Sequence, residues 1–505
     1  MPPSTEEKSS DGEHAKINGE VVSTGLSNDS GSGDNDNDND ALESSMVQDW
    51  ESPSDPGDPK NWSLGRKIIH TAIPGVFGFS VAFGTSVYAP GIPQVAKEMG
   101  VSIEVATLGI SLYSLGLALG PMLGAPISES KGRKAVYILT IPIFILFVMA
   151  CGLSKNITSL LVCRFFAGAF GAPCLAIGGG TVADLWDMKH GGGLAAVLFV
   201  QTMFLGPSLG PFIGGYALQT RGHWTWLMWV IILVTGPLYL ILFWSSETSK
   251  KEILRRRAKA RGLPEPPRPP PRVAMKMLFV VTLYRPLEML LTDPIVAFLA
   301  LYCSFAFGVL FAFFDAYPYV FMGVYGFTIA QSGLAFLGIF IGTLLSVLTF
   351  YIFDRTLYEK AKRKIAPDMM PAPEERLYTA MVGSFGIPVG LFWFAWTARE
   401  SVHWIVPTLG GIPFGWGMST IFFSGITYIV DTYGALFGAS AIAANGFLRY
   451  IFGAVFPLFT LQMYENLGIA WATSTLAFLS LLMLPIPMVL YKWGPKLRAR
   501  SKFTS

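Results

Sequence analysis

A few charged side chains stand inside long apolar stretches of this sequence. They are Arg164, Asp315 and Arg449, and Asn445 precedes Arg449 by one helical turn. A charge at the centre of a membrane-spanning helix costs roughly 2.5 to 3.5 kcal/mol on insertion scales. Residues kept at such a cost are candidates for binding an ion, a proton or a polar ligand.

Asp315 has the chemistry needed for proton binding. It follows Phe313 and Phe314 and precedes further apolar residues. A carboxyl group inside a membrane can change its protonation with its surroundings, which links proton binding to conformation. We predict this role for Asp315, and the alternatives are direct binding of a cationic ligand or hydration at the membrane surface. The other candidate acids stand at the ends of apolar stretches: Asp184, Asp293, Asp354, Asp431 and Glu465.

The arginines can serve for binding or for anchoring. Asn445 and Arg449 share one helix face at their spacing of four residues, and we predict that this pair faces a cavity. Arg164 lies near the start of its apolar stretch. A long side chain in such a position can instead extend to the membrane surface, and this remains the alternative for Arg164 and Arg449.

These residues require an all-α frame that crosses a membrane repeatedly. Of the 505 residues, 52% are hydrophobic and 14% are charged, whereas soluble proteins carry about a quarter charged residues. Uncharged stretches of about 20 residues, long enough for a helix to cross ~30 Å of hydrocarbon, recur along the chain. We predict twelve spans, near 68–88, 108–126, 135–153, 160–182, 194–218, 226–244, 294–320, 332–353, 377–396, 404–430, 437–461 and 470–491.

The spans divide into two sets of six, as in carriers built from two helix bundles with a ligand site between them. We predict a disordered tail at 1–60, a first bundle at 61–246, a linker at 247–291, a second bundle at 292–491 and a tail at 492–505. Lys and Arg gather in the linker, near the tails, and in the loops after spans 2 and 8. This bias predicts that both termini are cytoplasmic.

Several functional classes find no support in the sequence. The four cysteines show no CxxC spacing, and the five histidines form no pair at metal-ligand spacing. We therefore expect no metal, cofactor or disulfide. A membrane enzyme would need a phosphate loop or a nucleophile motif, and the sequence contains neither. The expected partners are lipid, protons and a small molecule, and no nucleic acid.

The fifth predicted span contains a glycine repeat, G-x-x-x-G-P-x-x-G-G. Its members are Gly206, Gly210, Pro211, Gly214 and Gly215. Glycines four residues apart give a smooth helix face that another backbone can approach closely, while proline removes a helical hydrogen bond. Tight helix packing without any further role is the alternative.

The loop between the second and third spans combines an acid, a turn and a base. Gly132 permits a tight turn between Glu129 and Arg133, whose charges we predict to form a gate together with Asp184. The alternative for the basic residues is that they only set the orientation in the membrane. Asp184 alternatively caps a solvated helix end.

Together these motifs resemble those of the major facilitator superfamily, and within it the twelve-span drug:proton antiporters. The glycine repeat is similar to the family's antiporter motif, and Arg164 to its fourth-span arginine motif. The loop 125–134 is similar to the cytoplasmic signature G-x-L-x-D/E-x-x-G-R-K/R, with Ala125 in place of the first glycine. The run 58–63, Asp-Pro-Lys-Asn-Trp-Ser, is typical of fungal multidrug and polyamine exporters.

The resemblance implies proton-driven export of small organic molecules across the plasma membrane by alternating access. Drugs, secondary metabolites, polyamines and organic acids are the substrate classes of such proteins. It also associates Arg164 with proton coupling, and we expect a monomer. The alternatives are a proton symporter or facilitator that imports a nutrient and, from another class, a membrane receptor or channel.

Overall fold

A computed structural model describes residues 49–187, 192–263, 280–364 and 371–504. The side chains of a few residues within these ranges, Glu129 among them, lie outside the description. The described residues contain helices and no strands, so the predicted all-α class is confirmed. Most of the disordered tail predicted at 1–60 lies outside the described residues.

The first set of helices, here called the N-terminal half, follows the first six predicted spans. Ser102 and Asn156 begin two of these helices by accepting a hydrogen bond from the backbone nitrogen three residues later. The short α3 (Ile92–Met99) follows the first span and ends at Gly100, whose φ is 65°. The helices are α2 (Leu64–Ser86), α4 (Ile103–Leu119), α5 (Pro121–Lys131), α6 (Arg133–Gly152), α7 (Ile157–Leu185), α8 (Gly192–Arg221) and α9 (Thr225–Leu242).

The second set, here called the C-terminal half, follows the last six predicted spans. Its longest element, α19, contains two residues with non-helical backbone angles, Gly434 (φ 57°) and Gly468 (φ 74°). Positive φ suits glycine, and the two breaks divide α19 into three lengths that correspond to the last three spans. The helices are α13 (Pro294–Gly323), α14 (Ile329–Leu334), α15 (Phe336–Phe353), α16 (Glu359–Lys362), α17 (Tyr378–Gly383), α18 (Gly386–Thr397), α19 (Ile405–Met483) and α20 (Ile486–Arg498).

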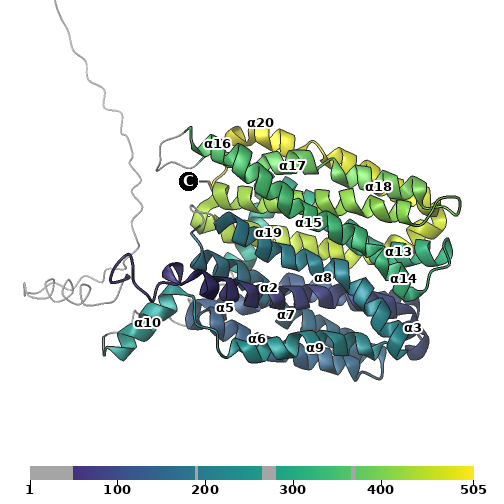
Figure 1. Cartoon of the computed structure of the whole chain (residues 1–505), viewed down its shortest axis with the longest axis horizontal. Helices are drawn as coiled ribbons and strands as arrows, with labels where there is room; N and C mark the ends of the chain where they lie inside the picture. Colours follow the sequence, from purple (N-terminus) through teal and green to yellow (C-terminus); the bar gives the residue numbers. More distant parts are fainter. Residues whose placement is uncertain (1–48, 188–191, 264–279, 365–370, 505) are drawn as a thin grey trace, which may run out of the picture. The chain divides into compact units, whose positions relative to one another are not determined.

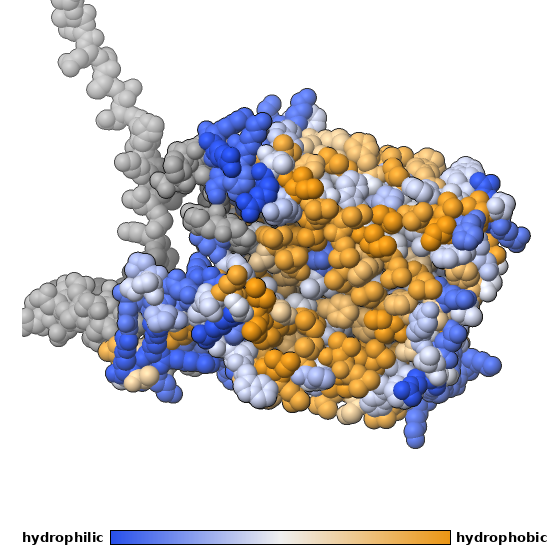
Figure 2. All heavy atoms as spheres, viewed as in Figure 1, coloured by the Kyte–Doolittle hydropathy of each residue, from blue (hydrophilic) through white to orange (hydrophobic). Residues whose placement is uncertain are grey.

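Nine helical stretches in the described ranges are long and apolar enough to cross a membrane, judged by length and composition. This number is smaller than twelve partly because one stretch, Phe437–Arg498, contains two of the predicted spans, and because α4 counts as a shorter apolar helix. The side of the bundle seen in Figure 2 carries a broad apolar band with hydrophilic residues toward both ends. The protein is therefore a multi-pass membrane protein.

The two halves contact each other through a few helix pairs. α4 packs against α19, and α8 packs against α14 and α15. The helices lie side by side in Figure 1, with α3 and α14 at one end of the bundle. α10 (Lys250–Ala260), which belongs to the predicted linker, lies at the other end. We call this second end the linker end and the first the opposite end.

Candidate functional site

Arg164 is buried in the N-terminal half, with 1% of its surface exposed. Its Nε donates to the carbonyl of Gly109 on α4 (3.0 Å), and its Nη1 donates to the carbonyl of Gly84 on α2 (2.8 Å). The guanidinium carbon lies 4.7 and 4.4 Å from the ring centres of Tyr88 and Tyr113. Arg164 does not extend to the membrane surface. It joins α7 to α2 and α4.

The two carbonyls that Arg164 binds belong to glycines for a steric reason. A Cβ atom on Gly84 would lie 2.5 Å from the hydroxyl of Tyr113, and one on Gly109 would lie 2.6 Å from the ring of Tyr88. The tyrosine hydroxyls donate in turn to backbone carbonyls on α2 and α4. Sequence reasoning missed these four residues, because no motif connects carbonyls on two other helices to Arg164.

Arg449 is buried in the C-terminal half, at 8% exposure, but its surroundings differ. The guanidinium carbon lies 4.9 Å from the ring centre of Phe307 and 4.7 Å from those of Phe422 and Tyr450. Its Nε is buried without a hydrogen-bond partner among the described residues. The rings face the cation but offer its Nε no strong hydrogen-bond acceptor.

Phe204 on α8, in the N-terminal half, packs against the rings that surround Arg449. Its ring centre lies 4.8 Å from that of Phe422 and 6.5 Å from that of Phe307, both in edge-to-face geometry. We call Phe204, Phe307, Phe422 and Tyr450 the aromatic cage. Because its members come from both halves, the cage lies at the interface of the two halves.

A layer of polar side chains lies one helical turn from the cage, toward the linker end. Gln201 precedes Phe204 by three residues, Ser304 precedes Phe307 by three, and Asn445 precedes Arg449 by four. Both amide atoms of Gln201 and the hydroxyl of Ser304 are buried without partners among the described residues. We call Gln201, Ser304 and Asn445 the polar layer. The sequence indicated only Asn445 of these three residues, because its spacing of four residues from Arg449 places both on one helix face.

Asp315 lies on the same helix as Phe307, two turns nearer the opposite end. A row of rings connects the two positions, with centres 4.7 Å apart for Phe307 and Phe311 and 4.9 Å apart for Phe311 and Phe314. One carboxylate oxygen of Asp315 is buried and has no hydrogen-bond partner in the described part of the chain.

Two of the predicted gate residues, Arg133 and Asp184, meet at the linker end. Arg133 Nε lies 3.3 Å from a carboxylate oxygen of Asp184, and Arg133 Nη1 donates to the hydroxyl of Ser128 (2.8 Å). Gly132 separates α5 from α6 with φ 86°. The side chain of Glu129 lies outside the described residues, so its expected contact with Arg133 stays a prediction.

Glu247 contacts the residues of the predicted gate, although the sequence placed it at the start of the linker. Its carboxylate accepts hydrogen bonds from the backbone nitrogens of Arg133 (2.8 Å) and Lys134 (3.1 Å). A Cβ atom on Gly132 would lie 2.5 Å from this carboxylate. The carboxylate therefore caps the start of α6, where helical nitrogens lack partners.

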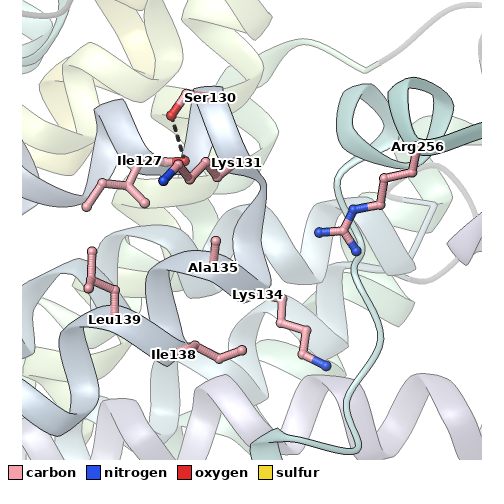
Figure 3. A pocket seen from close by; sticks show the side chains of 8 residues that line it. All are labelled: Ile127, Ser130, Lys131, Lys134, Ala135, Ile138, Leu139 and Arg256. Carbon is pink, nitrogen blue, oxygen red and sulfur yellow. Dashed lines mark hydrogen bonds between the residues drawn. The ribbon is translucent and has the colours of Figure 1, made fainter. Parts of the chain in front are cut away.

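Basic residues line a hollow beside the gate, between α5, α6 and α10. Figure 3 shows Lys131, Lys134 and Arg256 around an apolar floor that includes Ile138 and Leu139. Lys134 Nζ donates to the carbonyls of Phe243 (3.0 Å) and Ser245 (2.5 Å). The hollow thus borders the segment that carries Glu247.

Residues 49–62, here called the N-terminal strap, attach α10 to the bundle. Asp55 accepts from both terminal nitrogens of Arg257 (2.6 and 2.8 Å), and these hydrogen bonds lower the pKa of Asp55 below its usual range. Lys250 Nζ lies 2.6 Å from Asp49. On the other side of α10, Arg255 donates to the carbonyl of Ser130 at the end of α5 (2.8 Å).

The C-terminal half has its own charge cluster at the linker end. Arg376 contacts Asp431 (2.8 Å) and Asp354 (3.2 Å) and lies 3.5 Å from the ring centre of Tyr358. These two acids were recognised in the sequence only as span ends. Arg376 itself was missed, because it lies about twenty residues from one partner and more than fifty from the other.

The glycines of the fifth span pack α8 against α2. A Cβ atom would lie 2.6 Å from the backbone nitrogen of Phe83 if placed on Gly206, 1.8 Å from the hydroxyl of Ser86 on Gly210, and 2.6 Å from the carbonyl of Val87 on Gly214. These positions leave no room for a side chain. This is the packing that the glycine repeat predicts. Pro207 and Pro211 also lie inside α8, and each removes one backbone hydrogen bond from the helix.

Gly215, the last glycine of the repeat, lies at the contact between the two halves. A Cβ atom on Gly215 would lie 2.8 Å from the carbonyl of Ile329 in α14, and one on Gly333 would lie 2.5 Å from the carbonyl of Pro211. Near the same end, the side-chain amide of Gln462 donates to Glu104 across the α4 and α19 interface (3.0 Å). The halves are therefore joined at the opposite end.

The sequence is similar to a family model and to named transporters. The model described as Major Facilitator Superfamily matches residues 75–457. The chain is 38% identical to Polyamine transporter 4 of Saccharomyces cerevisiae, over 90% of this chain and 73% of that protein. It is 38% identical to MFS-type transporter traF of Penicillium crustosum, over 90% and 93%, and 39% identical to Efflux pump FUBT of Fusarium oxysporum, over 89% and 77%. The chain belongs to the major facilitator superfamily, and it is a membrane transporter and not an enzyme.

Proposed function

We propose that the protein is a proton-coupled antiporter that exports small organic molecules by alternating access. The observation that carries this proposal is the set of buried polar groups beside the aromatic cage that have no partner among the described residues, at the interface of the two halves. Relatives named as an efflux pump and a polyamine transporter support export. We further propose that the protein acts as a monomer in the plasma membrane, with the linker end in the cytosol.

The described conformation fits one stage of this cycle. The halves are joined at the opposite end by the close approach of α8 to α14 and by the bond between Gln462 and Glu104. The ion pair of Arg133 with Asp184 lies within the N-terminal half and does not bridge the halves. In this conformation we expect the outer end to be closed, and outward opening must separate α8 from α14.

We assign proton binding to Asp315. Eight residues separate it from Phe307, which corresponds to about 12 Å along the helix axis. This distance keeps the carboxylate apart from Arg449 but close enough for its charge to affect the cage through a medium of low dielectric constant. Protonation of Asp315 would then favour one conformation, and release of the proton the other.

The test uses the purified protein in proteoliposomes with an imposed pH gradient. We expect the gradient to drive accumulation of at least one of three probes, rhodamine 6G, spermidine or indole-3-acetate, in the direction opposite to proton flow. Asp315→Asn should abolish this gradient-driven accumulation and leave exchange of labelled for unlabelled probe in place.

Three results would contradict the proposal. Unchanged gradient-driven accumulation in the Asp315→Asn variant would remove Asp315 as the proton site. Accumulation in the same direction as proton flow would indicate the symporter alternative. Flux without exchange of labelled for unlabelled probe would indicate a channel.

A further inference from the structure

We propose that the cargo is an amphipathic organic anion, with its carboxylate bound by Arg449 and its apolar or aromatic body held in the aromatic cage. This inference rests on the proposed transport function, since it names the class of molecule carried at the same site. It adds a role for Gln201 and Ser304, whose polar groups would complete the binding of the carboxylate.

The charge of Arg449 carries the first step. Its Nε is buried, and no carboxylate lies within ion-pair distance of it among the described residues. The ring faces stabilise a cation but accept no strong hydrogen bond. A guanidinium presents its donors in a planar fork that matches a carboxylate in shape and charge. The missing partner is therefore best supplied by an anion.

The polar layer carries the second step. Buried polar groups are nearly always hydrogen-bonded, so several unpartnered groups at one level need an explanation. Gln201 is 3% exposed and Ser304 is fully buried, yet neither amide atom of Gln201 nor the hydroxyl of Ser304 has a partner in the described ranges. Gln201 and Ser304 precede Phe204 and Phe307 of the aromatic cage by three residues, about one helical turn, on α8 and α13. A ligand carboxylate has enough acceptor sites for the Gln201 amide, the Ser304 hydroxyl and Arg449 together.

The aromatic cage selects the part of the ligand beyond its carboxylate. Phe204, Phe307 and Phe422 present edge-to-face rings with centres 4.8 to 6.5 Å apart, a geometry that also accommodates a planar apolar body. A cation placed here would lie against Arg449. The nearest acid on the helix of Phe307, Asp315, stands about 12 Å from Phe307 along the axis, too far to neutralise that cation directly.

Three ligands of one ring system separate the possibilities: indole-3-acetate, indole-3-acetamide and tryptamine, which carry a negative, a neutral and a positive side chain. Binding of each to the full chain in lipid nanodiscs is measured by isothermal titration. We expect indole-3-acetate to bind at least tenfold more tightly than the acetamide, and tryptamine to bind most weakly.

Variants then test which residues produce the preference for indole-3-acetate over indole-3-acetamide. Arg449→Gln should reduce the preference for acetate over acetamide to less than twofold, whereas Arg449→Lys should keep part of it. Gln201→Leu should weaken acetate binding several-fold while Arg449 is intact. If Arg449→Gln does not fold, the wild-type ligand series and Gln201→Leu decide the question without it.

The outcomes also separate this inference from the proposed function. Tighter binding of tryptamine than of indole-3-acetate, or an unchanged acetate preference in Arg449→Gln, overturns the anion site. A pH gradient that drives rhodamine 6G while indole-3-acetate fails to bind leaves the antiporter standing and rejects the anion cargo. Binding of indole-3-acetate at Arg449 without any gradient-driven transport supports the anion site and rejects proton coupling.

Discussion

Arg164 and Arg449 are both buried arginines whose guanidinium groups lie over aromatic rings, but among the described residues Arg164 donates two hydrogen bonds to the protein, through Nε and Nη1, whereas no such bond is found for Arg449. A buried nitrogen without a described partner remains on each, Nη2 of Arg164 and Nε of Arg449. The hydrogen bonds of Arg164 end on the carbonyls of Gly84 and Gly109. Arg449 has rings around it and a buried Nε with no described partner. Burial and ring contacts are common to both residues, so the presence of acceptors distinguishes a structural arginine from one that can bind a ligand.

Replacing each arginine by methionine should produce the largest contrast. Arg164→Met removes two charge-assisted hydrogen bonds at roughly 1.5 to 3 kcal/mol each, so we expect a loss of about 3 kcal/mol or more. Arg449→Met removes a cation that is buried without an acidic partner among the described residues, and because burying an unpaired charge costs free energy, we expect stability to stay unchanged or rise. Thermal unfolding in detergent, followed by size-exclusion chromatography, measures both. Equal destabilisation of the two variants would remove the distinction.

Adding one methyl group beside each arginine sharpens the comparison. Gly84→Ala would place a Cβ atom 2.5 Å from the Tyr113 hydroxyl, so we expect destabilisation of about 1 to 3 kcal/mol. Gly446→Ala is the matched control, because its nearest neighbour is an Arg449 nitrogen at 4.0 Å. We expect the control to stay within about 0.5 kcal/mol of the wild type. The same unfolding assay reports both, and a larger effect at Gly446 would contradict the packing around Arg449.

Arg257 on α10, at the linker end, is a third arginine for comparison, and we expect the smallest effect on stability when its contact is weakened. Asp55→Asn weakens the attachment of Arg257, so hydrogen exchange in α10 should become faster while the thermal midpoint changes little. Since the folded-state pKa of Asp55 is lowered, its stabilising contribution is present above its unfolded pKa and is lost only as pH falls through the lower value. Exchange in the wild type should therefore not rise between pH 5 and 8 beyond the intrinsic dependence, which a peptide control measures.

The sequence predicts much of the fold because that information is local. Runs of apolar residues indicate the spans, and the spacing of Gly206, Gly210 and Gly214 indicates a close helix contact. Arg164 and Arg449 were both recognised as residues of interest by their position in apolar stretches. Their different surroundings were not visible, because the carbonyl of Gly84 and the ring of Phe204 come from other helices.

The gate illustrates the same limit. Gly132 and Arg133 were recognised from a short motif, and Asp184 from its place at a span end. Glu247 was missed because it follows Arg133, whose backbone nitrogen it caps, by 114 residues in the sequence. No local pattern around Glu247 indicates that its carboxylate faces the nitrogens of Arg133 and Lys134.

The position of Glu247 has a consequence for the order of synthesis. The backbone nitrogen of Arg133 lies 114 residues before the carboxylate that it binds, and Asp55 lies 202 residues before Arg257. A ribosome must therefore complete α9 before the start of α6 can be capped, and must continue past α10 before the strap can attach. During translation, α2 to α9 would wait in the membrane with this end unfinished, and the emerging linker would be the segment that completes it.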